Sequence, residues 1–217
     1  MMKTHILFDF DGTLVDSAPA ILSCFTQVLR LHGLEACCSV DDSLIGPPLR
    51  QTLESLSGQN DSALLDALST SFKDIYDAEV CLSTPAYAGW QSVFEGLRTQ
   101  GLTLAIATNK RLLPTQKIIS ILGWDGYFSE VFASDSHPTL YADKAGMIGA
   151  ALQVFGIEPQ AAIYIGDTQQ DARAATANEV DFWPVAWGYG SFGNEYEPLV
   201  LPSQLIERLA HPRLVKV

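Results

Sequence analysis

Acidic side chains follow two apolar runs of the sequence that have the length and composition of buried strands. Asp9 and Asp11 come directly after the first apolar run of the chain, and Asp167 and Asp171 follow another run, at residues 161–165. Carboxylates that lie close together repel one another unless a cation compensates their charge. Oxygen ligands without histidine or cysteine select a hard divalent ion, so these acids predict a Mg²⁺ site rather than a Zn²⁺ site.

A hydroxyl, an amide and an ammonium group join these acids near the ends of other expected strands. Thr108 and Asn109 follow the apolar run at residues 102–107, and Lys144 opens a later helix. With Mg²⁺, such groups suit phosphoryl transfer, in which one Asp attacks phosphorus and a second acid protonates the leaving alkoxide. Taken singly, each residue also fits a plain role, such as a turn residue, a helix cap or a solvated surface charge. The combination is what indicates a site.

The elements expected to position these residues alternate between strand and helix. We expect strands at residues 3–10, 102–107, 130–133, 161–165 and 180–186, and helices at residues 89–100, 114–122, 144–155, 170–178 and 203–209. Strands joined by helices of this length form a parallel sheet with helices on both faces, so the predicted fold is α/β with a Rossmann-like core. Ligands of such sheets bind beyond the carboxyl ends of the strands, where the polar residues fall.

Residues 17–84 have a different pattern. Apolar residues recur there at helical spacing in three stripes, without an intervening β-type run, and the turn sequence Gly46-Pro47-Pro48 separates the first two stripes. We therefore expect an α-helical domain at residues 17–84, inserted into an α/β core formed by residues 1–16 and 85–217.

Four segments of the chain resemble, in order, the motifs of the haloacid dehalogenase superfamily. They are Asp9-Phe10-Asp11-Gly12-Thr13-Leu14-Val15-Asp16-Ser17, Thr108-Asn109, Lys144, and Gly166-Asp167 with Asp171. The expected helical insertion is similar to the small α-helical cap of that superfamily. Lys144 is followed by Ala145, where many relatives have proline, and this departure leaves the subfamily open.

The resemblance implies a role for each matched residue. Asp9 would be a Mg²⁺ ligand and also the nucleophile, which forms an aspartyl-phosphate. Asp11 would be the general acid and base, and its backbone carbonyl would also contact the metal. Asp167 would bind Mg²⁺ directly, and Asp171 directly or through another group. The phosphoryl group would be held by Thr108, Asn109 and Lys144.

Asp11 favours a phosphatase over a dehalogenase, because an oxygen leaving group needs a proton and the dehalogenases lack this acid and the metal. Residues 45–50 and 187–190 resemble the phosphoglycolate phosphatase-like branch. The helical segment carries three basic and nine acidic residues. We therefore expect a substrate that has little charge beyond its phosphate group, or one whose carboxylate contacts Arg50. A 5'-nucleotidase-like or sugar-phosphate phosphatase is an alternative, as are a phospho-acceptor receiver and an inactive binding protein.

The composition limits the partners. A net charge of −12 in 217 residues argues against nucleic acid or an anionic membrane as the main ligand. The four cysteines lack metal-ligand spacing and indicate free thiols, and no secretory or membrane-spanning segment stands out. We therefore expect a cytoplasmic monomer or homodimer that acts on a small phosphorylated metabolite.

Overall fold

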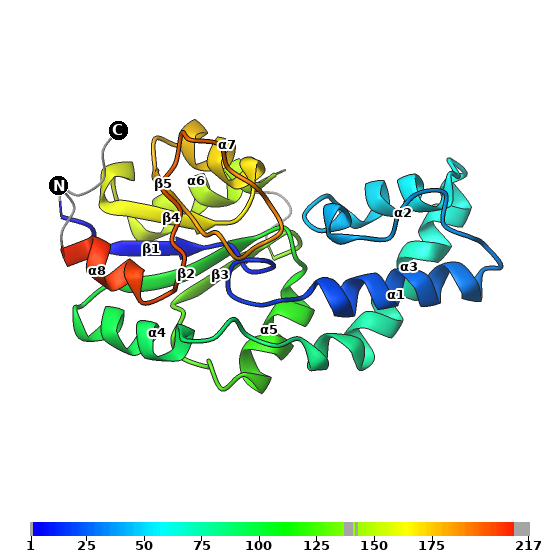
Figure 1. The fold of residues 1–217 in the computed structure, drawn as a ribbon, viewed down its shortest axis with the longest axis horizontal. Coiled ribbons are helices and arrows are strands. Elements are labelled where there is room, and N and C mark those ends of the chain that lie inside the picture. Colours follow the sequence, from blue (N-terminus) through cyan, green and yellow to red (C-terminus); the bar gives the residue numbers. More distant parts are fainter. Residues whose placement is uncertain (1, 137–140, 142, 211–217) are drawn as a thin grey trace.

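A five-stranded parallel sheet forms the centre of the α/β part of the computed structural model, which describes residues 2–136, 141 and 143–210 (Figure 1). The strands lie in the order β3-β2-β1-β4-β5. They are β1 (His5–Phe8), β2 (Thr103–Thr108), β3 (Glu130–Ala133), β4 (Ala162–Gly166) and β5 (Asp181–Pro184). The register pairs Phe8 with Ile106 of β2 and with Ile165 of β4, so three strands end at one edge. The predicted α/β fold is confirmed.

Helices cover both faces of this sheet (Figure 1). One face carries α4 (Trp90–Thr99), α5 (Leu112–Ile121) and α8 (Gln204–Ala210), and the other carries α6 (Lys144–Phe155) and α7 (Gln169–Ala177). Successive side chains of a strand point to opposite faces. Ile6 and Phe8 of β1 accordingly belong to the same buried cluster as Phe94, whereas Leu7 belongs to the cluster that contains Ile148. Burial on both faces explains why the strand is apolar throughout.

Residues 17–84 form helices and turns and no strand, as their sequence pattern predicts. We call this segment the helical insertion. It contains α1 (Ala18–Leu31), η1 (Asp42–Leu44), α2 (Leu49–Ser57), α3 (Ser62–Ala78) and η2 (Val80–Ser83). Figure 1 shows these helices beyond the end of the sheet where β1 leads into α1. The two segments that connect the insertion to the α/β core lie side by side, because the Asp16 amide donates to the Pro85 carbonyl at 2.9 Å.

The remaining element is η3 (Pro159–Ala161), a short turn that leads into β4. The longest described helix, α3, has 17 residues. Across residues 2–136, 141 and 143–210, no helix combines the length and the apolar character that crossing a lipid bilayer requires.

An aromatic cluster beneath β1 generates a prediction about stability. Phe94 of α4 is fully buried and contacts Phe8, Trp90, Trp124, Tyr127 and Phe128. The Phe94→Ala substitution should lower the free energy of unfolding by about 3–5 kcal/mol, because it removes a large buried side chain and leaves a cavity. Urea denaturation measures this loss. Leu113→Ala, at a half-exposed position, should stay within about 0.5 kcal/mol of the unchanged protein. Equal losses in the two variants would contradict the assignment of this cluster as core.

Candidate active site

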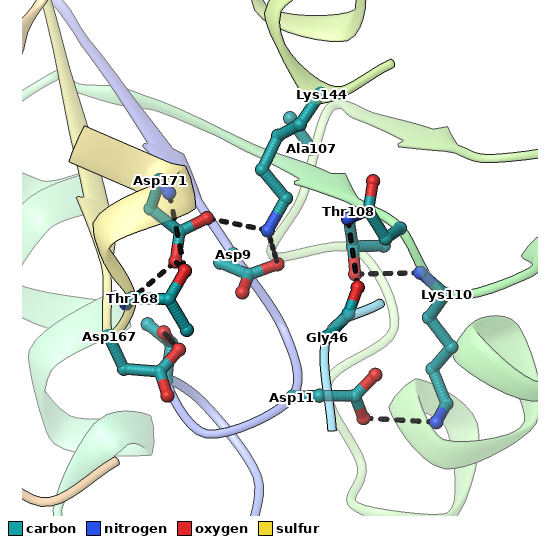
Figure 2. A network of polar contacts seen from close by, with 12 residues as sticks. Asp9, Asp11, Gly46, Ala107, Thr108, Lys110, Lys144, Asp167, Thr168 and Asp171 are labelled. Carbon is teal, nitrogen blue, oxygen red and sulfur yellow. Dashed lines mark hydrogen bonds and ion pairs between the residues drawn. The ribbon is translucent and has the colours of Figure 1, made fainter. Parts of the chain in front are cut away.

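Three carboxylates from neighbouring elements meet at the carboxyl end of the sheet (Figure 2). Asp9 follows β1, Asp167 follows β4, and Asp171 lies in the first turn of α7. Each offers one oxygen that lies within 4.8 Å of the other two, and all three residues are buried. Because β1 and β4 pair directly, the two strand-end acids must lie side by side. The structure thus brings together residues that are more than 150 positions apart.

The ammonium group of Lys144 joins two of these carboxylates. Its Nζ lies 3.0 Å from Asp9 Oδ1 and 2.5 Å from Asp171 Oδ1. The first turn of α6 holds Lys144 in place, because Asp143 caps this helix by accepting from the Gly146 amide at 2.8 Å. Burial alone would lower the pKa of the lysine, but Asp171 and Asp9 raise it above its usual value. Lys144 therefore carries a fixed positive charge beside Asp9.

Both carboxylate oxygens of Asp171 have donors within the protein. Oδ1 accepts from Lys144, while Oδ2 accepts from the Thr168 amide at 2.9 Å and from the Thr168 hydroxyl at 2.6 Å. The Thr168 hydroxyl also accepts from the Asp171 amide, which completes a capping box at the start of α7. Asp171 therefore orients Lys144 and caps the helix, and its carboxylate also lies close enough to Asp9 and Asp167 to share a cation with them.

Asp167 is held by donors from two loops. Its Oδ1 accepts from the Thr13 hydroxyl at 3.2 Å, and its Oδ2 accepts from the Tyr189 amide at 2.8 Å. The Tyr189 hydroxyl in turn donates to Asp16 at 3.0 Å and accepts from the Ala18 amide at 2.9 Å. The segment after β5 therefore connects Asp167 with the start of the helical insertion.

Glycines allow the two loops to approach Asp167 this closely. A Cβ atom on Gly12 would lie 2.3 Å from Asp167 Oδ2, and one on Gly188 would lie 2.2 Å from Asp167 Cβ. Gly12 also has a φ of +78°, which side chains other than glycine rarely adopt. These contacts give a physical reason for glycine in the first motif and in the segment at residues 187–190.

The electrostatics of the cluster favour a bound cation. Burial raises the pKa of the Asp9 carboxyl well above its usual value, and the neighbouring Asp171 and Asp167 add to this rise while Lys144 opposes it. Burial and Asp171 likewise raise the pKa of Asp167 to about 6. The three carboxylates share one ammonium group, so their negative charge is not balanced. Asp9 and Asp167 also have oxygen lone pairs that no donor among the described residues uses, because each carboxylate can accept about four hydrogen bonds. A hard divalent cation fits this oxygen-rich cluster.

Asp11 lies on the other side of Asp9 in Figure 2 and pairs with Lys110, a residue outside the four sequence motifs. Lys110 Nζ lies 3.0 Å from Asp11 Oδ1 and donates to the Tyr76 hydroxyl of α3 at 2.8 Å. The Lys110 amide donates to Thr108 Oγ1 at 3.1 Å, and Asn109 Nδ2 donates to the Gly46 carbonyl at 3.1 Å. The loop after β2 thus contacts both Asp11 and the helical insertion. In the sequence, the position of Lys110 directly after Thr108 and Asn109 is the feature that could have indicated a role in the site.

Arg50 does not join this cluster. Its guanidinium pairs with Asp66 and donates to Ser62 Oγ at 3.0 Å, which are residues of the same helical insertion. Its side chain is half exposed, and it is not among the described residues that line the cavity beside Asp11. Arg50 is thus held by contacts within the insertion, and its contact with a substrate carboxylate stays a prediction.

Comparisons with known proteins agree with this arrangement. Residues 6–185 match the family of haloacid dehalogenase-like hydrolases. A phosphoglycolate phosphatase of Psychrobacter arcticus is 30% identical over 92% of this chain and 90% of its own, and one of Rhodobacter capsulatus is 34% identical over 87% and 86%. The fold is similar to that of a predicted phosphatase from Clostridium acetobutylicum, whose crystal structure gives a TM-score of 0.85 at 23% identity. The match covers 97% of this chain and 99% of that one. The family match spans most of the chain, so this protein belongs to the haloacid dehalogenase-like hydrolases.

Proposed function

We propose that this chain, a phosphatase of the haloacid dehalogenase-like family, hydrolyses phosphomonoesters of small metabolites through an aspartyl-phosphate on Asp9. The observation that carries the proposal is the buried contact of Asp9 with Lys144, next to two further carboxylates. A carboxylate in this setting is oriented for attack, and a neighbouring ammonium can neutralise a phosphoryl oxygen. Phosphoglycolate phosphatase-like relatives at about one-third identity support the same reaction class.

Mg²⁺ is the proposed metal, with Asp9 and Asp167 as its carboxylate ligands and the Asp11 backbone carbonyl as a further ligand. Asp171 would bind the metal directly or act through Lys144 and Thr168, which donate to its oxygens. When bound, Mg²⁺ would offset negative charge on the carboxylates and on the phosphoryl group. The unbalanced charge of the cluster supports this cofactor.

In the first half of the proposed reaction, a carboxylate oxygen of Asp9 attacks phosphorus while the bond from phosphorus to the leaving oxygen breaks. Asp11, in its acid form, gives its proton to that oxygen, so the product leaves as an alcohol. Thr108, Asn109 and Lys144 orient the phosphoryl oxygens. Lys110 positions the Asp11 carboxyl through the contact of 3.0 Å.

In the second half, Asp11 accepts a proton from water, and the resulting hydroxide oxygen attacks phosphorus. The bond between phosphorus and Asp9 breaks, which releases inorganic phosphate and restores the Asp9 carboxylate. The same residue thus serves first as the acid and then as the base, so the proton balance closes over one turnover.

The names of the relatives make phosphoglycolate the first substrate to test, with 5'-nucleotides and sugar phosphates as alternatives. We place the reaction in the cytoplasm. Four free cysteines, two of them exposed, support a reducing compartment.

Replacement of the nucleophile should abolish turnover. An amide at position 9 cannot form the aspartyl-phosphate, so Asp9→Asn should lower kcat by at least about 100-fold, measured as release of inorganic phosphate. Asp125→Asn, an exposed position in a distant turn, is the matched control and should keep full activity. A rate for Asp9→Asn within about tenfold of the unchanged protein would remove Asp9 as the nucleophile.

The role of Asp11 predicts a dependence on the leaving group. Asp11→Asn should slow alcohol release from an alkyl phosphate by about 10²–10⁴-fold, because the alkoxide needs a proton. Release of p-nitrophenol from its phosphate in a single turnover should fall far less, since that leaving group departs as a stable anion. Equal losses with both substrates would show that Asp11 is not the acid.

Removal of Asp167 should weaken the metal site. Asp167→Ala should shift the Mg²⁺ concentration that gives half-maximal activity upward by about tenfold or more, because it removes one charged ligand. The expected shift is read from activity titrated with MgCl₂, and Asp125→Ala serves as the control. If the titration curve of Asp167→Ala matched that of the unchanged protein, the metal site would have to lie elsewhere.

A further inference from the structure

A cavity of about 480 Å³ lies next to the proposed reaction centre, between the helical insertion and the carboxyl edge of the sheet. Asp11, Asn109 and Lys110 line it from the core, and residues of α1, η1, α2 and α3 line it from the insertion. Asp11 is the group that would protonate the leaving oxygen. The cavity therefore lies where the alcohol part of a phosphomonoester must be.

The volume of this cavity exceeds what a two-carbon alcohol needs. Pockets of about 300–1,000 Å³ enclose most of the surface of ligands that are much larger than glycolate. With glycolate as the leaving group, most of the cavity would remain filled by water. A larger alcohol would displace that water and bury its own surface.

The walls of the cavity are largely apolar on the side of the insertion. Ile21 and Phe25 come from α1, Leu44 from η1, Leu49 from α2 and Phe72 from α3, and Met147 of α6 faces them from the core. Contact with such a wall stabilises an alkyl or aromatic group by roughly 25 cal/mol for each Å² that is removed from water. A carboxylate or a second phosphate would instead lose its hydration there.

The charged residues around the cavity offer little to a second anion. Lys110 is paired with Asp11, and Arg111 is paired with both carboxylate oxygens of Asp77, at 2.6 and 2.7 Å. Asp135 and Asp143 also line the cavity and would repel an anion.

Lys73 lines the same cavity, and no carboxylate partner is found for it among residues 2–136, 141 and 143–210. Its side chain is exposed, and an ion pair in water contributes little.

We propose that the preferred substrates are phosphomonoesters of uncharged alcohols that are larger and more apolar than glycolate. Their apolar body lies against Ile21, Phe25 and Phe72, and their ester oxygen lies toward Asp11. This inference rests on the proposed phosphatase function and specifies its substrate class.

A homologous series of substrates tests the inference with purified enzyme and saturating Mg²⁺. Methyl, ethyl, n-butyl and n-hexyl phosphate share one type of leaving group and differ in apolar length. The value of kcat/KM should rise about fourfold for each added methylene group until the cavity is filled. The n-butyl ester matches phosphoglycolate in its number of non-hydrogen atoms, and it should be hydrolysed faster than phosphoglycolate.

Two neighbouring residues of α1 provide a matched pair of variants. Ile21 lines the cavity, whereas Leu22 does not, and both are partly buried against the core. Ile21→Ala should lower the ratio of kcat/KM for n-hexyl over methyl phosphate by about tenfold, because it removes part of the apolar wall. Leu22→Ala should leave that ratio unchanged. The ratio does not depend on the fraction of folded enzyme.

The outcomes separate this inference from the function on which it rests. A flat alkyl series with phosphoglycolate as the best substrate would overturn the inference and leave the phosphatase standing. So would a selective loss of phosphoglycolate turnover in Lys73→Gln, since Lys73 would then bind a second anion. No turnover of any phosphomonoester with Mg²⁺ would overturn the proposed function, and the inference with it.

Discussion

The burial of three carboxylates around one ammonium group is the interaction on which the rest of the site depends. Asp9, Asp167 and Asp171 are withdrawn from water at the edge of the sheet, and Lys144 compensates part of their charge. Burial without compensation favours protonation, as the raised pKa values of Asp9 and Asp167 show. In the proposed reaction, a bound divalent cation would reverse this preference and keep Asp9 in the form that can attack phosphorus. On this proposal, metal binding and activation of the nucleophile would be linked through the same charges.

The burial follows from the arrangement of the strands and helices. Parallel pairing of β1 with β4 places two strand ends side by side, and helices on both faces exclude water from them. Glycines at positions 12 and 188 let the flanking loops contact Asp167 without a steric conflict. The helical insertion adds Tyr76, which reaches Lys110 and through it Asp11. On the proposed mechanism, the α/β core would hold the phosphoryl group, and the helical insertion would contact the apolar part of the alcohol.

Much of this arrangement could be predicted, because its signals are local. Five apolar runs with turn residues between them define the sheet, and Asp9 and Asp167 stand directly after two of these runs. The contacts of Lys110, Tyr189 and Arg50 could not be predicted. Lys110 meets Tyr76 across 34 positions and Tyr189 meets Asp167 across 22, and neither pairing leaves a periodic pattern in the sequence. The loop at residues 45–50 suggests that Arg50 faces the substrate, whereas its ion-pair partner Asp66 lies one helix further along the chain.

The central claim is that Asp9 carries the phosphoryl group during turnover. The most direct measurement is to quench the enzyme in acid during hydrolysis of a phosphomonoester with Mg²⁺, reduce it with borohydride and map its peptides by mass spectrometry. An acyl phosphate on Asp9 is reduced to homoserine, so we expect homoserine at position 9 in the sample with substrate and aspartate there in the sample without it. Homoserine at another aspartate, or unmodified Asp9 under conditions of steady turnover, would contradict the account.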